Sequence, residues 1–156
     1  MARITVNGAN TQPILQVSTD TSNVANAPLT VTCLQDVTIT NSTGIFSWTD
    51  FCSPAGVNKI TTPADNEIST NMVLDGNVWF GTGGSGNATQ YGISGLSEDA
   101  VKVSWKLFMN GNANGAFYYT GTGYVSALAP TVSPEAPVWV SPMTIAVDGT
   151  MTSGTV

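Results

Sequence analysis

The sequence contains no histidine and very little charge. Charged residues make up 9% of its 156 residues, with four Lys and Arg against ten Asp and Glu and a net charge of −6; soluble domains usually contain about 25% charged residues. Without an imidazole, histidine-based catalysis and histidine-ligated metal sites are excluded. Four cations are also too few to build a basic face that grips nucleic acid phosphates. They are Arg3, Lys59, Lys102 and Lys106.

Long apolar runs are missing as well. No stretch approaches the roughly 18 apolar residues of a membrane helix, and residues 1–8 lack the apolar run of a signal peptide. We therefore expect a chain made in a cytoplasm, without a membrane. The spacing of Cys33 and Cys52 fits neither a CxxC pair nor a zinc site. We expect two reduced thiols, with a disulfide as the alternative.

What the sequence does have is a hydrophobic fraction of 42% and an alternation of apolar and polar residues typical of half-buried β-strands. In the first half this alternation predicts strands at about residues 29–40, 45–51 and 68–74. We expect a turn at residues 41–44 and a polar loop from residue 52 to Asn66.

In the second half, Asp75-Gly76 predicts a hairpin turn leading into a strand at 78–80. The glycine-rich residues 81–86 predict a flexible connection, and residues 96–100 predict one helical turn with Ser97 as its N-cap. Proline-containing residues 133–137 predict a rigid turn. Further strands are expected at 101–109, 117–125, 138–140 and 143–147.

These elements predict a mainly β fold, an antiparallel β-sandwich or distorted barrel with at most one short helix. Residues 1–28 are the least patterned part, with Ile14, Leu15 and Val17 in a background of Thr, Asn and Ser. We expect them to form an extended N-terminal arm with one short strand. Residues 29–156 would then form the β-sandwich domain.

The residues that could support chemistry all have a simpler interpretation. Residues 81–86 lack the Gly-Lys-Ser/Thr ending of a phosphate loop, and Glu98-Asp99 is expected to face a helix dipole rather than to form an acid–base pair or a calcium site. The sequence has no imidazole to act as the general base for a serine, threonine or cysteine nucleophile. We therefore predict that the chain is not an enzyme and has no catalytic residues, cofactor or metal.

Most aromatic residues are in phase with an apolar strand face, which predicts core packing. Trp139 lies beside two turn prolines and is the best candidate for an exposed ring. Because sugars stack on exposed rings, a carbohydrate-binding module is one possible function.

The low charge itself predicts self-association. A soluble monomer usually keeps charges of both signs over its surface, whereas charged residues are depleted where interfaces are fully buried. An arm that cannot bury itself could lie on a neighbouring copy, and exposed edge strands could pair between copies. A weakly charged monomer is the alternative.

Three runs in the C-terminal half resemble the major tail tube proteins of tailed bacteriophages. They are VKVSWKLFM at 101–109, GAFYYTGTGYVS at 115–126 and MTIAVDG at 143–149. The long Thr-rich strand and the aromatic strand upstream are compatible with the same family. The family usually has a distinct helix between two sheets, and residues 89–100 leave room for only about one to three turns.

The resemblance implies a structural virion protein whose β-sandwich subunits form hexameric rings that stack into a hollow tube for genome delivery. One sheet of each subunit would join an inner barrel, and the loop at 52–67 and both terminal segments would contact the next ring. The partners would be other copies of the chain and other phage tail proteins. The protein would assemble in the host bacterial cytoplasm and reside in the virion tail.

An acidic chain suits such a channel, since a wall that bound phosphates would retard DNA. By position, Asp36, Glu67 and Asp75 are candidates for acids that face the lumen, past which DNA would move without specific binding. The alternative function is a capsid decoration or carbohydrate-binding module of a virion, with Trp139 and Tyr124 exposed.

Overall fold

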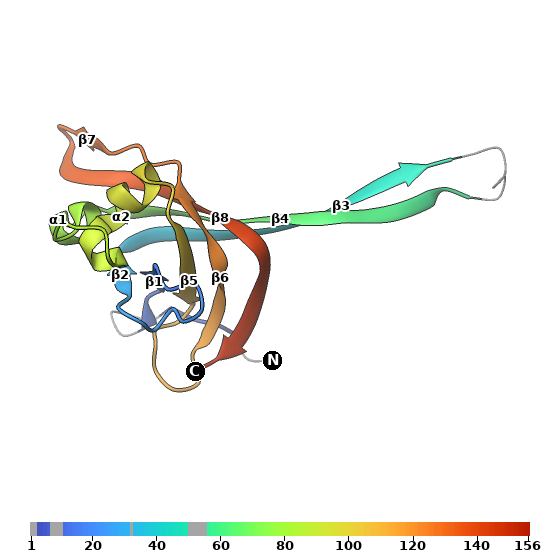
Figure 1. The fold of residues 1–156 in the computed structure, drawn as a ribbon, viewed down its shortest axis with the longest axis horizontal. Coiled ribbons are helices and arrows are strands. Elements are labelled where there is room, and N and C mark those ends of the chain that lie inside the picture. The colour runs from blue at the N-terminus through green and yellow to red at the C-terminus, as the bar shows by residue number, and fades with distance from the viewer. Residues whose placement is uncertain (1–2, 7–10, 32, 50–55) are drawn as a thin grey trace.

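The computed structural model describes residues 3–6, 11–31, 33–49 and 56–156. These residues form one antiparallel sheet of eight strands and two helices (Figure 1). The predicted mainly β, antiparallel fold is confirmed. In chain order the elements are β1 (Ile14–Ser18), β2 (Leu29–Val31), β3 (Leu34–Trp48), β4 (Asn58–Val73), α1 (Gly76–Phe80), α2 (Ala88–Glu98), β5 (Lys102–Phe108), β6 (Phe117–Ser126), β7 (Thr131–Ser133) and β8 (Ala136–Thr155).

The strand order is β2-β1-β5-β6-β8-β4-β3, with β7 paired to β8. Strands β2 and β3 form the two edges, although only two residues separate them along the chain. The sheet must therefore curl until its edges approach each other at this junction. The Val73 N–H donates to the Cys33 carbonyl (3.2 Å), which extends the pairing of β3 and β4 up to the junction. The curled sheet does not close into a barrel, because β2 and β3 do not pair.

The core lies on one face of the curled sheet. Alternate residues of the strands are fully buried there, as the period-two pattern predicts, and helix α2 contacts β6 and β2 on this side. The largest buried side chains are those of Trp105, Leu15, Ile68, Met72, Ile93, Leu96, Leu107, Met143 and Ile145.

The prediction of at most one short helix is wrong, because residues 76–80 form helix α1 instead of a strand. Asp75 is its N-cap rather than part of a hairpin turn. The Asp75 carboxylate accepts hydrogen bonds from the backbone N–H groups of Asn77 (2.9 Å) and Val78 (3.2 Å). These bonds satisfy two donors that have no partner within the helix.

Helix α2 begins about nine residues before the predicted start at Ser97. Its N-cap is Asn87, whose side chain accepts from the Gln90 N–H (3.1 Å), while the Gln90 side chain accepts from the Asn87 N–H (3.1 Å). This is a capping box. The predicted flexible connection at 81–86 is tied to the same helix, since the N–H groups of Thr82 and Gly83 donate to the carbonyls of Thr89 and Gln90.

The predicted turn at 41–44 and the predicted polar loop up to Asn66 are also wrong. Strand β3 continues to Trp48 and pairs with β4 from Asn58 onward, in one long hairpin. Thr and Ser residues fill these strands, and such side chains suit strands as well as turns. The end of the strand predicted as far as residue 51 and the start of the polar loop predicted from residue 52 fall on residues 50–55, which lie outside the described residues.

The short strand expected within residues 1–28 is β1. It lies between β2 and β5, with Leu15 and Val17 fully buried. The turn that follows is held by Asp20, whose carboxylate accepts hydrogen bonds from Ser22, Asn23 and Asn26. Whether residues 1–28 act as an arm on a neighbouring copy stays a prediction.

Candidate functional site

The sheet face opposite the core carries mainly small polar side chains, and we call it the polar face. The strand registers align its residues in rows that cross the sheet, such as Thr40, Glu67, Ala146, Tyr124 and Lys102. The acids on this face are Asp36, Asp65, Glu67 and Asp148, and the cations are Lys102 and Lys106. The polar face therefore has more negative than positive charges.

Two of the three acids that the sequence singles out lie on this face. Asp36 and Glu67 are exposed on the adjacent strands β3 and β4. The Asp36 carboxylate accepts from the backbone N–H (3.0 Å) and the side-chain amide (2.8 Å) of Asn71, which fixes its orientation. Asp75 is not on the polar face, because it caps α1 beyond the end of β4.

Both cations of the polar face interact with other side chains of the same chain. Lys102 forms an ion pair with Asp148 (2.5 Å), and the bond and charge of that carboxylate raise the pKa of Lys102. The Lys106 ammonium lies 3.8 Å from the ring centroid of Tyr118 and 5.0 Å from that of Phe108. Such contacts weaken the electrostatic attraction between these cations and an anion from outside the chain.

The long hairpin of β3 and β4 projects away from the rest of the molecule (Figure 1). Strand β8 pairs with β4 only from Glu67 to Val73, so residues 58–66 of β4 extend past the sheet with β3 as their partner. At about 3.3 Å per residue, the projection is about 30 Å long. Exposed apolar side chains cover its outer part: Ile45, Phe46, Trp48, Val57 and Ile60.

The core packing expected of most aromatic residues is wrong for Trp48, which is exposed on the hairpin. A signal was present in the sequence. Ile45 and Phe46 are consecutive and point to opposite faces of a strand, as alternation requires. A strand that is apolar on both faces and is not covered by its own chain indicates burial against another molecule.

The opposite end of the molecule is formed by α1, α2 and the β7–β8 hairpin (Figure 1), and it also exposes large apolar side chains. Phe80 is 71% exposed and Trp139 is 52% exposed, so the predicted exposure of Trp139 is confirmed. Both rings border a groove of about 340 Å³ between α1 and β8, which we call the α1–β8 groove. Its lining residues are Leu74, Gly76, Trp79, Phe80, Pro130 and Trp139.

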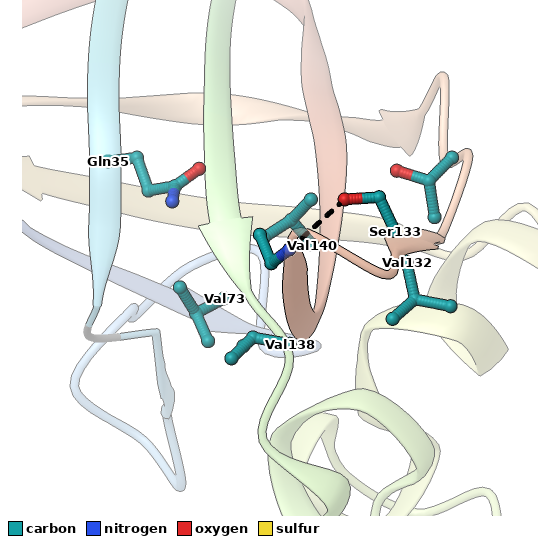
Figure 2. A pocket seen from close by; sticks show the side chains of 8 residues that line it. Gln35, Val73, Val132, Ser133, Val138 and Val140 are labelled. Carbon is teal, nitrogen blue, oxygen red and sulfur yellow. Dashed lines mark hydrogen bonds between the residues drawn. The ribbon is translucent and has the colours of Figure 1, made fainter.

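A second groove lies on the other side of β8, because consecutive residues of a strand point to opposite faces. Figure 2 shows Val138 and Val140 of β8 beside Val73 of β4, with Val132 and Ser133 of β7 across from them. We call this the valine groove. The Ser133 hydroxyl accepts a hydrogen bond from the Ala136 N–H (3.3 Å), which stabilises the turn between β7 and β8.

Glu98 and Asp99 lie at the end of α2, where Asp99 is the C-cap. The prediction that they face the positive end of a helix dipole is therefore wrong. Carboxylates at a helix C-terminus are repelled by the partial negative charge of its carbonyl groups. These two acids add uncompensated negative charge to the apolar end of the molecule.

The described residues contain no cluster of acidic or cysteine side chains that could hold a metal ion. Within the same part of the chain, no helix is long and apolar enough to cross a membrane. Cys33 is exposed and has a left-handed backbone with φ of 60°, whereas Cys52 lies outside the described residues.

No protein-family model and no curated protein matches the sequence. Solved structures do match. A chain in the tail of an empty GTA particle with C6 symmetry has a TM-score of 0.58 at 12% identity, covering 90% of this chain and 96% of its own length. A chain of the anti-feeding prophage baseplate, 6-fold symmetrised, has a TM-score of 0.57 at 6% identity, covering 97% and 98%. The chain thus has the fold of subunits in phage-like tail and baseplate particles.

Proposed function

We propose that the chain is the major tail tube subunit of a phage-like particle and assembles with itself into stacked hexameric rings. The observation that carries the proposal is the match over nearly the full length of both chains to a subunit of a six-fold symmetric tail. The exposed apolar hairpin and the scarcity of charge support a chain that is buried by its own copies.

Strand β3 is the edge best suited to pair with the next subunit of a ring. Unpaired edges attract other strands unless Lys, Pro or a covering segment protects them. Residues 34–48 contain no Lys, Arg or Pro, whereas the projecting part of β4 carries Lys59 and Pro63. Pairing through β3 would continue the polar face from one subunit to the next.

In such a ring the polar face would line the lumen. Asp36 and Glu67 are exposed on it, and both cations of the face have partners within the chain. A wall of this kind repels phosphates weakly and offers few cations for them to bind, so DNA would pass without sticking. Asp75, which caps α1, would not contribute to the lumen.

The hairpin and the terminal segments would contact the next ring. Ile4 of the N-terminal segment shares a groove with Phe117 and with Thr155 at the end of β8. Ile4 and Phe117 are exposed there, and Val156, whose N–H donates to the Ala116 carbonyl, is exposed beside Phe117. The protein would function in the virion tail with other tail proteins as partners, after assembly in the host bacterial cytoplasm, and would have no enzymatic role.

The carbohydrate-binding alternative finds support in one feature, the exposed Trp139 ring beside Phe80. A sugar site also needs polar side chains to hydrogen-bond the hydroxyl groups. Apart from the indole N–H groups of Trp79 and Trp139, the lining of the α1–β8 groove includes no side chain that could do so. We therefore favour protein over sugar as its occupant.

Negative-stain electron microscopy of the purified chain at increasing concentration tests the proposal. We expect rings and tubes with a central channel. Sedimentation velocity on the same samples should show a shift from monomers to large species. A chain that stays monomeric at millimolar concentration would refute the proposed function.

A further inference from the structure

We infer that Asn114 is a site of self-modification, at which the side-chain amide is lost and a carboxylate replaces it. The loop between β5 and β6 contains two asparagines that are each followed by glycine, in the pairs Asn110-Gly111 and Asn114-Gly115. An asparagine in this setting is reactive because the next residue has no Cβ to hinder the approach of its backbone nitrogen. The structure holds the two pairs differently, and this difference selects Asn114.

The reaction needs water as its only co-reactant. The Gly115 nitrogen loses its proton to the solvent and attacks the side-chain carbonyl carbon of Asn114, and ammonia leaves as a succinimide ring closes. Water then opens the ring at either of its two carbonyl groups. The products are aspartate and isoaspartate, in which the backbone runs through the former side chain. Both products carry one new negative charge at neutral pH.

The Asn110 pair is held at both reacting groups. The Asn110 side-chain oxygen accepts a hydrogen bond from the Phe117 N–H (3.0 Å), which fixes the amide in place. The Gly111 N–H donates to the Gln12 carbonyl (3.1 Å), and Gly111 is buried. Attack at Asn110 therefore requires two hydrogen bonds to open and water to reach a buried nitrogen.

The Asn114 pair is more accessible. Asn114 and Gly115 are the exposed central residues of a turn that is closed by the Ala116 N–H, which donates to the Ala113 carbonyl (3.0 Å). Within the part of the chain that the structure describes, the Asn114 side chain makes no hydrogen bond. Its amide can therefore turn toward the Gly115 nitrogen without first breaking a contact.

Val156 holds the nitrogen that attacks. The Gly115 N–H donates to the Val156 carbonyl (2.9 Å), and the Val156 N–H donates to the Ala116 carbonyl (2.9 Å). Val156 is exposed and follows the end of β8 at Thr155. Hydrogen bonds at the ends of strands open more often than those in the interior of a sheet. Because each opening releases the Gly115 nitrogen, the contact with Val156 controls the rate of the reaction at Asn114.

The new charge would fall on a surface that has none. Residues 107–134 and 149–156 contain no Asp, Glu, Lys or Arg, and Phe117 at the start of β6 lines a groove with Ile4 and Thr155. The consequence rests on the proposed function, in which the terminal segments contact the next ring. A carboxylate buried in such a contact loses its hydration and weakens assembly. The chain would then lose its capacity to assemble if it stays unassembled for long.

Peptide mapping by mass spectrometry, after incubation of the unassembled chain at mildly alkaline pH, tests the inference. The need to open one more hydrogen bond lowers a rate by about fivefold, so we expect Asn114 to convert at least about fivefold faster than Asn110. Conversion that is equal at the two sites, or faster at Asn110, would overturn the inference.

A chain that ends at Thr155 tests the role of Val156. This variant lacks the acceptor for the Gly115 N–H and should convert Asn114 about fivefold faster than the full chain does. Asn110 is the internal control in the same molecule, and its rate should be unchanged. A shortened chain that converts Asn114 no faster than the full chain would contradict control by Val156.

Assembly of aged samples tests the consequence. Asn114→Gln keeps an uncharged amide and reacts far more slowly, because its longer side chain has to form a larger ring. Fresh samples of both chains should form tubes equally well. After the same incubation the wild type should need a severalfold higher concentration, whereas Asn114→Gln should not. An equal loss in both chains would overturn the link between Asn114 and assembly. Fresh wild-type chains that form no tubes would instead overturn the proposed function, while conversion at Asn114 would still be measurable.

Discussion

Phe46 and Trp48 stack on each other in the projecting hairpin, with ring centroids 6.0 Å apart and both rings exposed. Two aromatic side chains exposed to solvent about 20–30 Å beyond the end of the β4–β8 pairing do not stabilise a core. Their position is understandable if another molecule covers them. This pair links the fold to self-assembly more directly than any other described contact.

The first prediction concerns this pair. Phe46→Ser should change the free energy of unfolding of the monomer by less than about 1 kcal/mol, because the ring is exposed. It should nevertheless raise the concentration required for tube formation by about tenfold or more, since buried aromatic residues dominate interfaces. Thermal melting and sedimentation measure the two effects.

Tyr124→Ser is the matched control for this variant. Tyr124 is an exposed aromatic residue on the polar face rather than on the hairpin. It should leave both melting and assembly unchanged. An equal loss of assembly in the two variants would contradict a special role for the hairpin.

The second prediction concerns the polar face. Glu67→Lys should make assembled tubes retain short DNA fragments at low salt, because the variant places an unpaired cation where an acid was. The retention should disappear as salt is raised. Asp99→Lys makes the same change of charge at the end of α2. Tubes of this variant should retain no more DNA than wild-type tubes. Equal retention by both variants would argue against a lumen lined by the polar face.

The third prediction concerns the packing of the two helices. Gly92 has φ of 67°, and a Cβ added there would lie 2.3 Å from the Gly81 nitrogen and 2.5 Å from the Trp79 carbonyl oxygen. Gly92→Ala should therefore lower the free energy of unfolding by about 3 kcal/mol.

Gly95→Ala is the control within the same helix. A Cβ at Gly95 would meet only Tyr91 at an ordinary 3.5 Å, and alanine is favoured over glycine in a helix by about 0.5–1 kcal/mol. Chemical denaturation should thus show opposite signs for the two variants. Equal effects would mean that the close approach of α1 and α2 is not as described.

The fourth prediction concerns acid stability. Hydrogen bonds from Asn26 and Ser22 lower the pKa of Asp20 from 3.8 to about 2. The unfolded chain then takes up a proton at this carboxyl before the folded chain does, so its stabilisation is complete above about pH 4 and is lost as the pH falls to about 2.

Asp20→Asn cannot titrate and isolates this contribution. The difference in stability between wild type and variant should shrink as the pH falls through this window, measured by denaturation at a series of pH values. A difference that stays constant from pH 5 to pH 2 would rule out the lowered pKa. The turn from Ser18 to Asn26 would then owe its order to other contacts.

The β-rich class could be predicted from the sequence because the strands alternate. Trp105 and Leu107, in phase with Val103, are buried as their spacing indicates. The position of α2 could also have been predicted, since Asn87 and Gln90 have the spacing of a capping box. The Asp75-Gly76 pair was misleading because an aspartate favours a turn and a helix N-cap for the same reason, its short acceptor side chain.

The long hairpin could not be predicted in the same way. The hairpin strands do not pack on the core, so their sequence does not need to alternate between apolar and polar residues. In addition, Asn41 and Gly44 are residue types typical of turns. Likewise, Asp36, Glu67 and Asp75 look equivalent in the sequence. Only the strand pairing places Asp36 and Glu67 together and leaves Asp75 at a helix end.

A cryo-electron microscopy reconstruction of the assembled chain tests the central claim most directly. The account predicts tubes of stacked six-membered rings, with Glu67 facing a central channel and the hairpin of each subunit in contact with another copy. A reconstruction with the polar face on the outside, or particles without a channel, would contradict it.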